Sequence, residues 1–202
     1  HQIGAMHPNS PKPEETDMMG KFIMKNYAPV SQAYGFHFKQ YHKSIFTPVI
    51  REPIRKLEPT NLGHYTVYLP SYDDAHLLKH LTKFSDVQWE VFSKHNNRPL
   101  HVKNVKIQPI DNDAFVKSMA SAEGVLCGAG FETPAEALYL GKKVLAIPMK
   151  NQYEQHLNAA ALEDIGIPII KSLKKKYEYD IEVWLNSTNK VKVDYPNNTM
   201  QI

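Results

Sequence analysis

The stretch that decides the fold is Val125-Leu-Cys-Gly-Ala-Gly-Phe-Glu-Thr-Pro-Ala-Glu-Ala-Leu-Tyr-Leu-Gly141. Its first three residues are apolar without alternation, which is typical of a strand covered on both faces. Gly128 and Gly130 have no side chain, so a ligand or another part of the chain can approach the backbone closely there. Residues 133–136, Thr-Pro-Ala-Glu, have the pattern of an N-cap, a proline in the first turn and a capping-box glutamate, and Gly141 is placed to end the helix. A strand, a glycine turn and a helix N-terminus predict an anion site, because free N–H groups and the helix dipole point at the turn.

The composition sets the class of protein. The chain has 202 residues, which suits one domain, or one domain and part of another. Hydrophobic residues make up 42%, enough for a packed core, and no run approaches the roughly 20 apolar residues of a membrane span. The single cysteine, Cys127, excludes an internal disulfide and indicates a reducing compartment. The formal net charge of +3 does not indicate a nucleic-acid partner.

Residues 1–62 differ from the rest, because they hold half of the 14 prolines. We expect a loop over 6–16, a helix over 17–26 with Met18, Met19, Phe22 and Ile23 inward, strands over 34–41 and 45–50, and a linker over 51–62. Elements this short cannot bury a core of their own. They are therefore expected to be the last elements of a domain whose beginning lies outside the chain.

From residue 63 the pattern alternates regularly between strands and helices. Strands are predicted over 65–69, 87–92, 102–107, 125–127, 144–148 and 167–170, and helices over 72–84, 111–122, 133–140, 153–165 and 179–186. This alternation predicts an α/β domain over 63–185, with a Rossmann-like parallel sheet and helices on both faces. Residues 186–202 are expected to form a polar tail.

Two features of the site leave alternatives open. The turn at Gly128–Gly130 lacks the Lys-Ser/Thr of a P-loop and comes late for a dinucleotide fingerprint, so it is either a plain tight turn or a phosphate site. Glu136 either closes a capping box on Thr133 or accepts hydrogen bonds from a ribose diol. From spacing alone the cap is the simpler interpretation.

Other polar residues have weaker signals. Glu154 and Gln155 fall in the first turn of a helix, where they are either solvated or hydrogen-bonded to sugar hydroxyls. Asn158 is placed to orient the preceding loop. His76 and His80 lie four apart on a helix but lack the glutamate of the zinc-protease motif, so no metal site is predicted. The lysine run 174–176 is a solvated surface, or a contact with an anionic membrane.

Residues 127–169 carry a resemblance to a known family. Cys-Gly-Ala-Gly-Phe-Glu-Thr-Pro-Ala-Glu-Ala-Leu-Tyr-Leu-Gly-Lys-Lys-Val-Leu-Ala-Ile-Pro, followed by Glu154-Gln-His-Leu-Asn-Ala159, is similar to the donor-binding half of GT-B glycosyltransferases. This group includes the UDP-glycosyltransferases and the peptidoglycan N-acetylglucosaminyltransferases, and the likeness is strongest to bacterial and archaeal members of undefined specificity. The resemblance implies that residues 1–62 end an N-terminal acceptor domain and lead into the linker.

The resemblance also implies roles for individual residues. The turn Gly128-Ala129-Gly130-Phe131, assisted by Thr133 and Ser71, would bind the donor diphosphate. Glu136 would hold the ribose hydroxyls, which reverses the preference for a cap. Pro109 and Ile110 would border the base, and Glu154 and Gln155 would bind the donor sugar.

Glycosyl transfer by the intact protein is the function that the resemblance implies. The expected donor is a nucleotide-sugar, most simply a UDP-sugar, and the acceptor a lipid-linked or small molecule. No metal cofactor is expected, because a helix N-terminus would stabilise the departing diphosphate. The family's general base lies early in the N-terminal domain, so this chain alone is expected to bind a donor without turning it over.

Two other functions stay open, a sugar-nucleotide epimerase of the same architecture and a non-catalytic sugar-nucleotide-binding module. The expected compartment is the cytoplasm, either free or peripheral at the inner face of the membrane.

Overall fold

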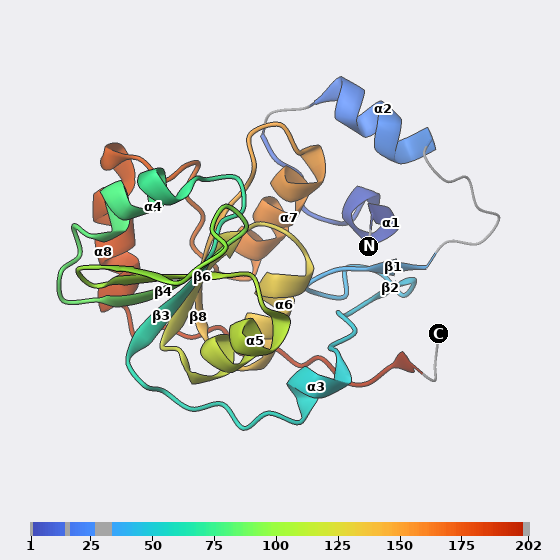
Figure 1. The fold of residues 1–202 in the computed structure, drawn as a ribbon. Helices are drawn as coiled ribbons and strands as arrows, with labels where there is room; N and C mark the ends of the chain where they lie inside the picture. Colours follow the sequence, from blue (N-terminus) through green and yellow to red (C-terminus); the bar gives the residue numbers. More distant parts are fainter. Residues whose placement is uncertain (1, 15–16, 27–33, 200–202) are drawn as a thin grey trace.

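A six-stranded sheet in the order β5-β6-β4-β3-β7-β8 forms the centre of the molecule (Figure 1). The computed structural model describes residues 2–14, 17–26 and 34–199. The sheet comprises β3 (His64–Tyr68), β4 (Gln88–Ser93), β5 (Leu100–Val102), β6 (Val105–Pro109), β7 (Gly124–Gly128) and β8 (Lys143–Ile147). All neighbours pair in parallel except β5 and β6. The predicted α/β class is therefore confirmed, with one antiparallel strand at the edge.

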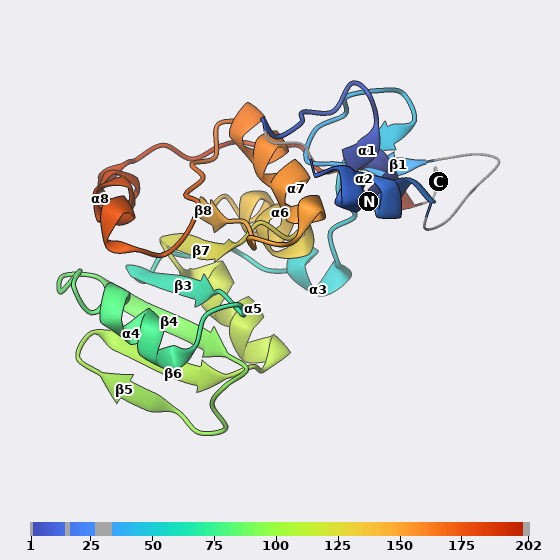
Figure 2. The same ribbon diagram turned by 90° about the horizontal axis from the view of Figure 1, so that it is seen from above.

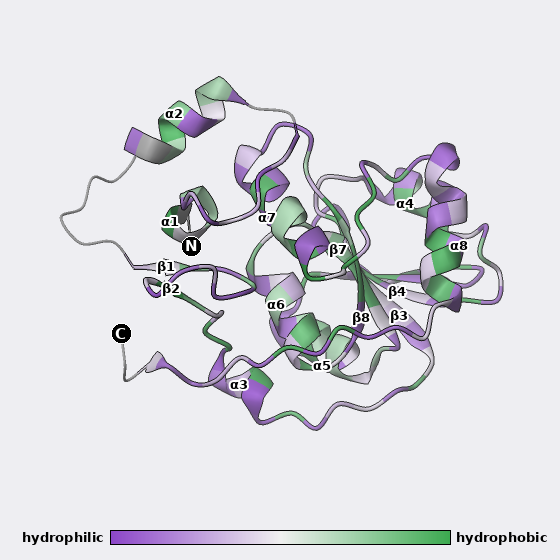
Figure 3. Cartoon of the chain, turned by 180° about the vertical axis from the view of Figure 1, so that it is seen from behind, coloured by the Kyte–Doolittle hydropathy of each residue, from purple (hydrophilic) through white to green (hydrophobic). Residues whose placement is uncertain are grey.

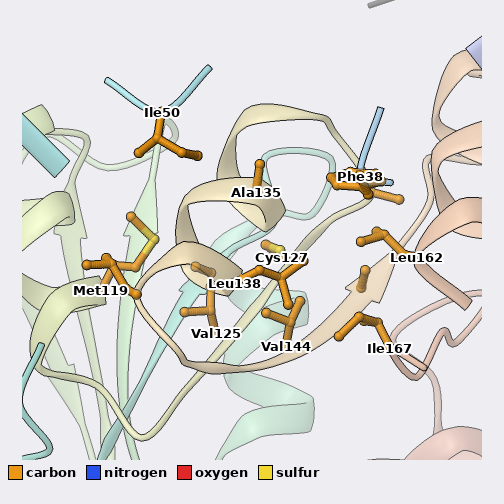
Figure 4. Packing of buried hydrophobic residues seen from close by; sticks show 14 of the residues in the cluster. Phe38, Ile50, Met119, Val125, Cys127, Ala135, Leu138, Val144, Leu162 and Ile167 are labelled. Atoms are coloured by element: carbon orange, nitrogen blue, oxygen red, sulfur yellow. The ribbon is translucent and has the colours of Figure 1, made fainter. Parts of the chain in front are cut away.

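Helices cover both faces of the sheet (Figure 2). On one face α4 (Asp74–Leu81) and α8 (Glu178–Asn186), which follows the short 3-10 turn η1 (Lys175–Tyr177), pack on Val67, Leu126 and Leu145. On the other face α5 (Asn112–Ser121), α6 (Glu132–Tyr139) and α7 (Tyr153–Asp164) enclose the alternate side chains, such as Val125 and Cys127. Figure 4 shows this second core closing around β7 and β8. The run of apolar residues in β7 does not alternate because the strand is buried on both faces, as the sequence predicted.

The described elements before residue 60 pack directly onto this second layer of helices. They form α1 (Gln2–Met6), α2 (Met18–Asn26), β1 (Gly35–Phe36), β2 (Ile45–Phe46) and α3 (Glu52–Arg55). Phe38, Ile50 and Ile54 belong to the core of α5, α6 and α7. A Cβ on Gly4 would lie 2.3 Å from the carbonyl oxygen of Phe36, so glycine is required where α1 meets β1. The division of the chain at residue 62 stays a prediction.

The polar tail after α8 returns to the N-terminal elements. Tyr195 is 3% exposed and joins the core of α5, α6 and α7. Its hydroxyl donates to the carbonyl of Phe38 over 3.1 Å, and Arg55 Nη2 donates to the carbonyl of Tyr195 over 2.9 Å. The tail therefore ties α3 and residue 38 to the sheet domain.

The structure differs from several of the predictions about the elements. The apolar side chains of α2 are 54–81% exposed (Met18, Met19, Phe22 and Ile23), so α2 does not bury the face predicted (Figure 3). The strands predicted over 34–41 and 45–50 shorten to β1 and β2. The loop predicted over 6–16 is confirmed over 7–14, since only Met6 belongs to α1, and residues 15 and 16 lie outside the described residues. The linker predicted over 51–62 contains α3.

The other wrong predictions lie at the two edges of the sheet. The strand predicted over 102–107 is a hairpin, because Lys103 turns the chain with φ 54° and β5 folds back on β6. The strand predicted over 167–170 is a single bridge between Ala146 and Ile169. In that register the N–H of residue 168 would donate to Val144, and Pro168 has none, so the ladder stops there.

Candidate functional site

The carboxyl ends of β3 and β7 mark the place where the sheet reverses its order. From β3 the chain builds outward through β4 and β6, and then returns to add β7 and β8 on the opposite side of β3. In open α/β sheets ligands bind in the crevice at such a switch point, outside the carboxyl ends of the strands. The turn after β7 and the start of α6 lie at this point (Figure 1). Topology therefore places the predicted anion site where a ligand is expected.

The glycines of this turn are needed neither for backbone conformation nor for packing. The glycines of the described chain with positive φ are Gly63, Gly141 and Gly166, so Gly128 and Gly130 lie outside the left-handed region. A Cβ on Gly130 would meet nothing within 4 Å, and one on Gly128 would make ordinary contacts at 3.7 and 3.9 Å. What glycine provides here is open space directly above the backbone, which is what close approach by a ligand requires.

The helix after the turn begins earlier than predicted. α6 starts at Glu132, its N-cap is Phe131, and the N-cap makes no side-chain hydrogen bond. Thr133 is therefore the second helical residue and not the cap, and Pro134, the third, carries no N–H. The predicted capping box does not form.

These positions decide which backbone donors face the turn. Ala129 donates its N–H to the carbonyl of Ile147 over 3.2 Å, which continues the ladder between β7 and β8. The N–H groups of Glu132 and Thr133 lie in the first turn of α6, where the helix itself supplies no carbonyl to accept them, and the N–H of Gly130 precedes them in the turn. Together with the dipole of α6 they are the groups predicted to bind an anion. The N–H of Ala129 is therefore already used within the sheet and does not point to a diphosphate, so its predicted role would come from its place in the turn.

Two amides of α7 support the turn from the side. Asn158, fully buried, donates from Nδ2 to the carbonyl of Ala129 over 3.1 Å. Gln155 Oε1 accepts the N–H of Met149 over 2.9 Å and lies 3.7 Å from the position of a Cβ on Gly128. Asn158 thus holds the glycine turn after β7, and not the loop before α7 for which it was predicted. Gln155 has its oxygen occupied, which leaves its NH₂ as the group able to donate to a ligand.

Glu136 forms an ion pair that the sequence did not reveal. Its carboxylate oxygens accept from Arg51 Nε over 2.5 Å and from Arg51 Nη2 over 2.9 Å, and the third guanidinium nitrogen donates to Asn112 Oδ1 over 3.1 Å. Glu136 is 4% exposed. The hydrogen bond to Glu136 raises the pKa of Arg51, against the opposing effect of burial. A bidentate guanidinium–carboxylate pair of this kind is among the stronger polar contacts in proteins.

Arg51 is the site residue that sequence reasoning missed. Arg51 precedes α3 in the predicted linker, 85 positions from Glu136, and no periodicity connects the two. The sequence contains one weak signal, an arginine directly after the apolar residues Val49 and Ile50 where the chain enters the linker. The pairing also places the linker against the ribose carboxylate predicted for the site.

The remaining predicted residues are spread along the same edge of the sheet. Ser71 is exposed in the turn after β3, Pro109 is the last residue of β6, and Ile110 follows it with 49% exposure. Glu154 is half-buried in the first turn of α7. The roles of these residues in donor binding stay predictions.

No cluster of three metal-binding side chains occurs among residues 2–14, 17–26 and 34–199. His76 contacts the carbonyl of Leu173 over 2.7 Å, and His80 lies 3.7 Å from Glu178. Burial raises the pKa of Cys127 to about 12, as for an inert thiol in a core. No helix in the described part of the chain is long and apolar enough to cross a membrane.

Comparison with known proteins identifies the family. The sequence model of glycosyl transferase family 1 matches residues 3–187. The chain belongs to this family. A comparison with curated protein sequences gave no match.

Solved structures show the fold that this family member shares. The glycotransferase of kitacinnamycin superimposes on 72% of this chain and 42% of its own, with a TM-score of 0.51 and 13% identity. MurG of Acinetobacter baumannii matches with a TM-score of 0.44 and 18% identity, over 69% of this chain and 45% of its own. SnogD of Streptomyces nogalater matches with a TM-score of 0.44 and 12% identity, over 92% of this chain and 50% of its own. The chain thus spans at most half the length of these three structures.

Proposed function

We propose that this family 1 member supplies the donor-binding half of an inverting glycosyltransferase whose donor is a nucleotide-sugar, most simply a UDP-sugar. The open glycine turn at the start of α6 carries the proposal. It offers backbone donors and the positive end of a helix dipole to a diphosphate, at the switch point of the sheet. The edges of the site suit the rest of a nucleotide-sugar, with Pro109 and Ile110 beside the base and Gln155 toward the sugar.

The chemistry would be a single displacement. A base from an N-terminal domain takes the proton of an acceptor hydroxyl, and the acceptor oxygen attacks the anomeric carbon of the sugar. The bond from that carbon to the diphosphate oxygen breaks, the configuration inverts, and the nucleoside diphosphate leaves. The N–H groups at the start of α6 stabilise the charge that develops on the leaving oxygen, so no metal is needed in this scheme. The acceptor would be a lipid-linked or small molecule, met in the cytoplasm or at its membrane face.

Titration calorimetry tests the donor site. The 202-residue chain is titrated with UDP, GDP and dTDP and with the corresponding nucleotide-sugars. We expect binding of one diphosphate, tighter binding of a sugar conjugate, and no sugar transfer by this chain alone. Absence of binding by all these ligands would overturn the proposal. Turnover by this chain without further residues would overturn the assignment of the base to another domain.

Gln155 gives a test of the sugar subsite with a matched control. Gln155→Ala removes the free NH₂ beside the turn and is expected to lower the affinity for the nucleotide-sugar more than that for the bare diphosphate. Gln152→Ala is the control, because Gln152 lies three residues away, is exposed and caps α7 with no side-chain hydrogen bond. Equal losses for both ligands in Gln155→Ala would place the sugar elsewhere.

A further inference from the structure

The carboxylate predicted to hold the ribose is covered in this structure. Arg51 spans both oxygens of Glu136 and holds Asn112 with its third nitrogen. The side chain of Glu136 is 5% exposed, while that of Arg51 is 45% exposed. The two partners therefore differ in exposure. The guanidinium of Arg51, from the linker, is half-exposed, and the carboxylate of Glu136 lies on the buried face of α6.

The space beside this pair is too small for a ribose. The adjoining cavity, between residues 48–51 and residues 131–136, has a volume of about 50 Å³. Sites for small ligands measure roughly 300–1,000 Å³. A sugar ring consequently cannot reach Glu136 while Arg51 stays in place.

The difference in exposure decides which partner moves. Glu136 is the fifth of the eight residues of α6, its neighbours Ala135 and Ala137 are buried, and its own side chain is 5% exposed, so the carboxylate is fixed away from water. Arg51 can move, because nearly half of its side chain already faces solvent and a long flexible stem carries its charge. When the side chain of Arg51 moves away, its guanidinium enters solvent and is not left buried. The hydroxyls of a ribose diol would then donate to the Glu136 carboxylate in its place.

We propose that the Arg51–Glu136 pair is an autoinhibitory contact that closes the ribose site, and that a ribose diol must displace it; the inference rests on the proposed nucleotide site. Arg51 is also the residue in front of α3, and its carbonyl accepts the N–H groups of Ile54 and Arg55 over 3.0 and 3.1 Å. These backbone hydrogen bonds hold residue 51 at the start of α3, so the displacement moves the side chain of Arg51 and leaves the linker in place.

The test uses uridine, which has no phosphate, so that any effect of Arg51 acts through Glu136. Affinities for uridine, 2′-deoxyuridine and UDP are measured by ligand-observed NMR on the full chain and on Arg51→Ala, Arg51→Lys and Arg55→Ala. Arg51→Ala is expected to bind uridine about 10-fold more tightly, equivalent to about 1.4 kcal/mol. Arg51→Lys should give a smaller gain, because an ammonium makes one contact where the guanidinium makes two. For 2′-deoxyuridine, which lacks half of the diol, the gain should shrink.

Arg55→Ala is the charge-matched control. Arg55 lies four residues along the linker and donates to the carbonyls of Ile50 and Tyr195, and it makes no contact with Glu136. Its removal should leave the affinity for uridine unchanged. Thermal unfolding of each variant checks the fold, and Arg51→Lys serves as the decisive variant if Arg51→Ala unfolds.

The outcomes separate this proposal from the one on which it rests. Tighter uridine binding by the Arg51 variants, with Arg55→Ala unchanged, supports the autoinhibitory contact. Unchanged or weaker uridine binding, in a chain whose wild type binds UDP, overturns the contact alone and leaves the nucleotide site standing. Failure of wild type and all variants to bind either uridine or UDP overturns the proposed UDP site and the contact with it.

Discussion

Gly130→Ala gives the sharpest test of the glycine turn, because stability and binding should change in different directions. The new methyl group would meet nothing within 4 Å, and the backbone lies outside the left-handed region, so the folded state accepts it without strain. Replacing glycine at such a position stabilises by about 0.4–1 kcal/mol, chiefly by restricting the unfolded chain. The methyl group nevertheless occupies the space above the N–H groups of α6. We expect nucleoside diphosphate affinity to fall at least about 10-fold, or about 1.4 kcal/mol.

Gly141→Ala is the matched control for this prediction. Its Cβ would also meet nothing within 4 Å, but Gly141 has φ 67° at the end of α6. A residue other than glycine in that conformation costs about 1–2 kcal/mol. For a chain of this size the midpoint of thermal unfolding should fall by about 2–8 °C. Nucleotide affinity should stay unchanged, since Gly141 lies at the far end of the helix.

Calorimetry and thermal unfolding of both variants check the reasoning. A loss of stability in Gly130→Ala as large as that in Gly141→Ala would show that the turn needs glycine for its conformation. Full nucleotide affinity in Gly130→Ala, with the wild type binding, would show that no ligand approaches the turn.

Three further predictions follow from burial. Phe22→Ser on α2 should change the free energy of unfolding by no more than about 0.5 kcal/mol, because Phe22 is 67% exposed, and a thermal melt showing a loss above 2 kcal/mol would contradict this. Cys127 should resist thiol reagents at pH 8 in the native state and react after unfolding, since burial raises its pKa to about 12 and keeps the thiol protonated; rapid native-state labelling would refute it. Burial lowers the pKa of Lys142 to about 8, so the unfolded chain binds more protons between pH 8 and pH 10. The free energy of unfolding of the wild type relative to Lys142→Met should therefore rise over that window, by at most about 1.4 kcal/mol per pH unit, and chemical denaturation at several pH values measures it.

The sheet domain could be predicted from sequence because its patterns are local. An apolar run such as Val125–Cys127 between turn residues is typical of a buried strand. Asp111 has the residue type of an N-cap, and it forms the N-cap of α5 by accepting the N–H of Ala114 over 2.7 Å. The order of strands and helices then fixed the glycine turn at the carboxyl edge of the sheet. The resemblance over 127–169 named the family, and its sequence model confirms it.

Tertiary packing decided what these local patterns could not. The apolar stripe of α2 has helical spacing whether or not another element covers it, so spacing could not show that its side chains face outward. Thr133 and Glu136 are spaced as a capping box, yet α6 begins at Glu132 and its glutamate pairs with a residue 85 positions away. A hydrogen bond between distant residues leaves no periodic trace in a sequence. The chain's sequence therefore determined the strand, turn and helix of the predicted anion site, and only the folded structure revealed that Arg51 pairs with the carboxylate of Glu136.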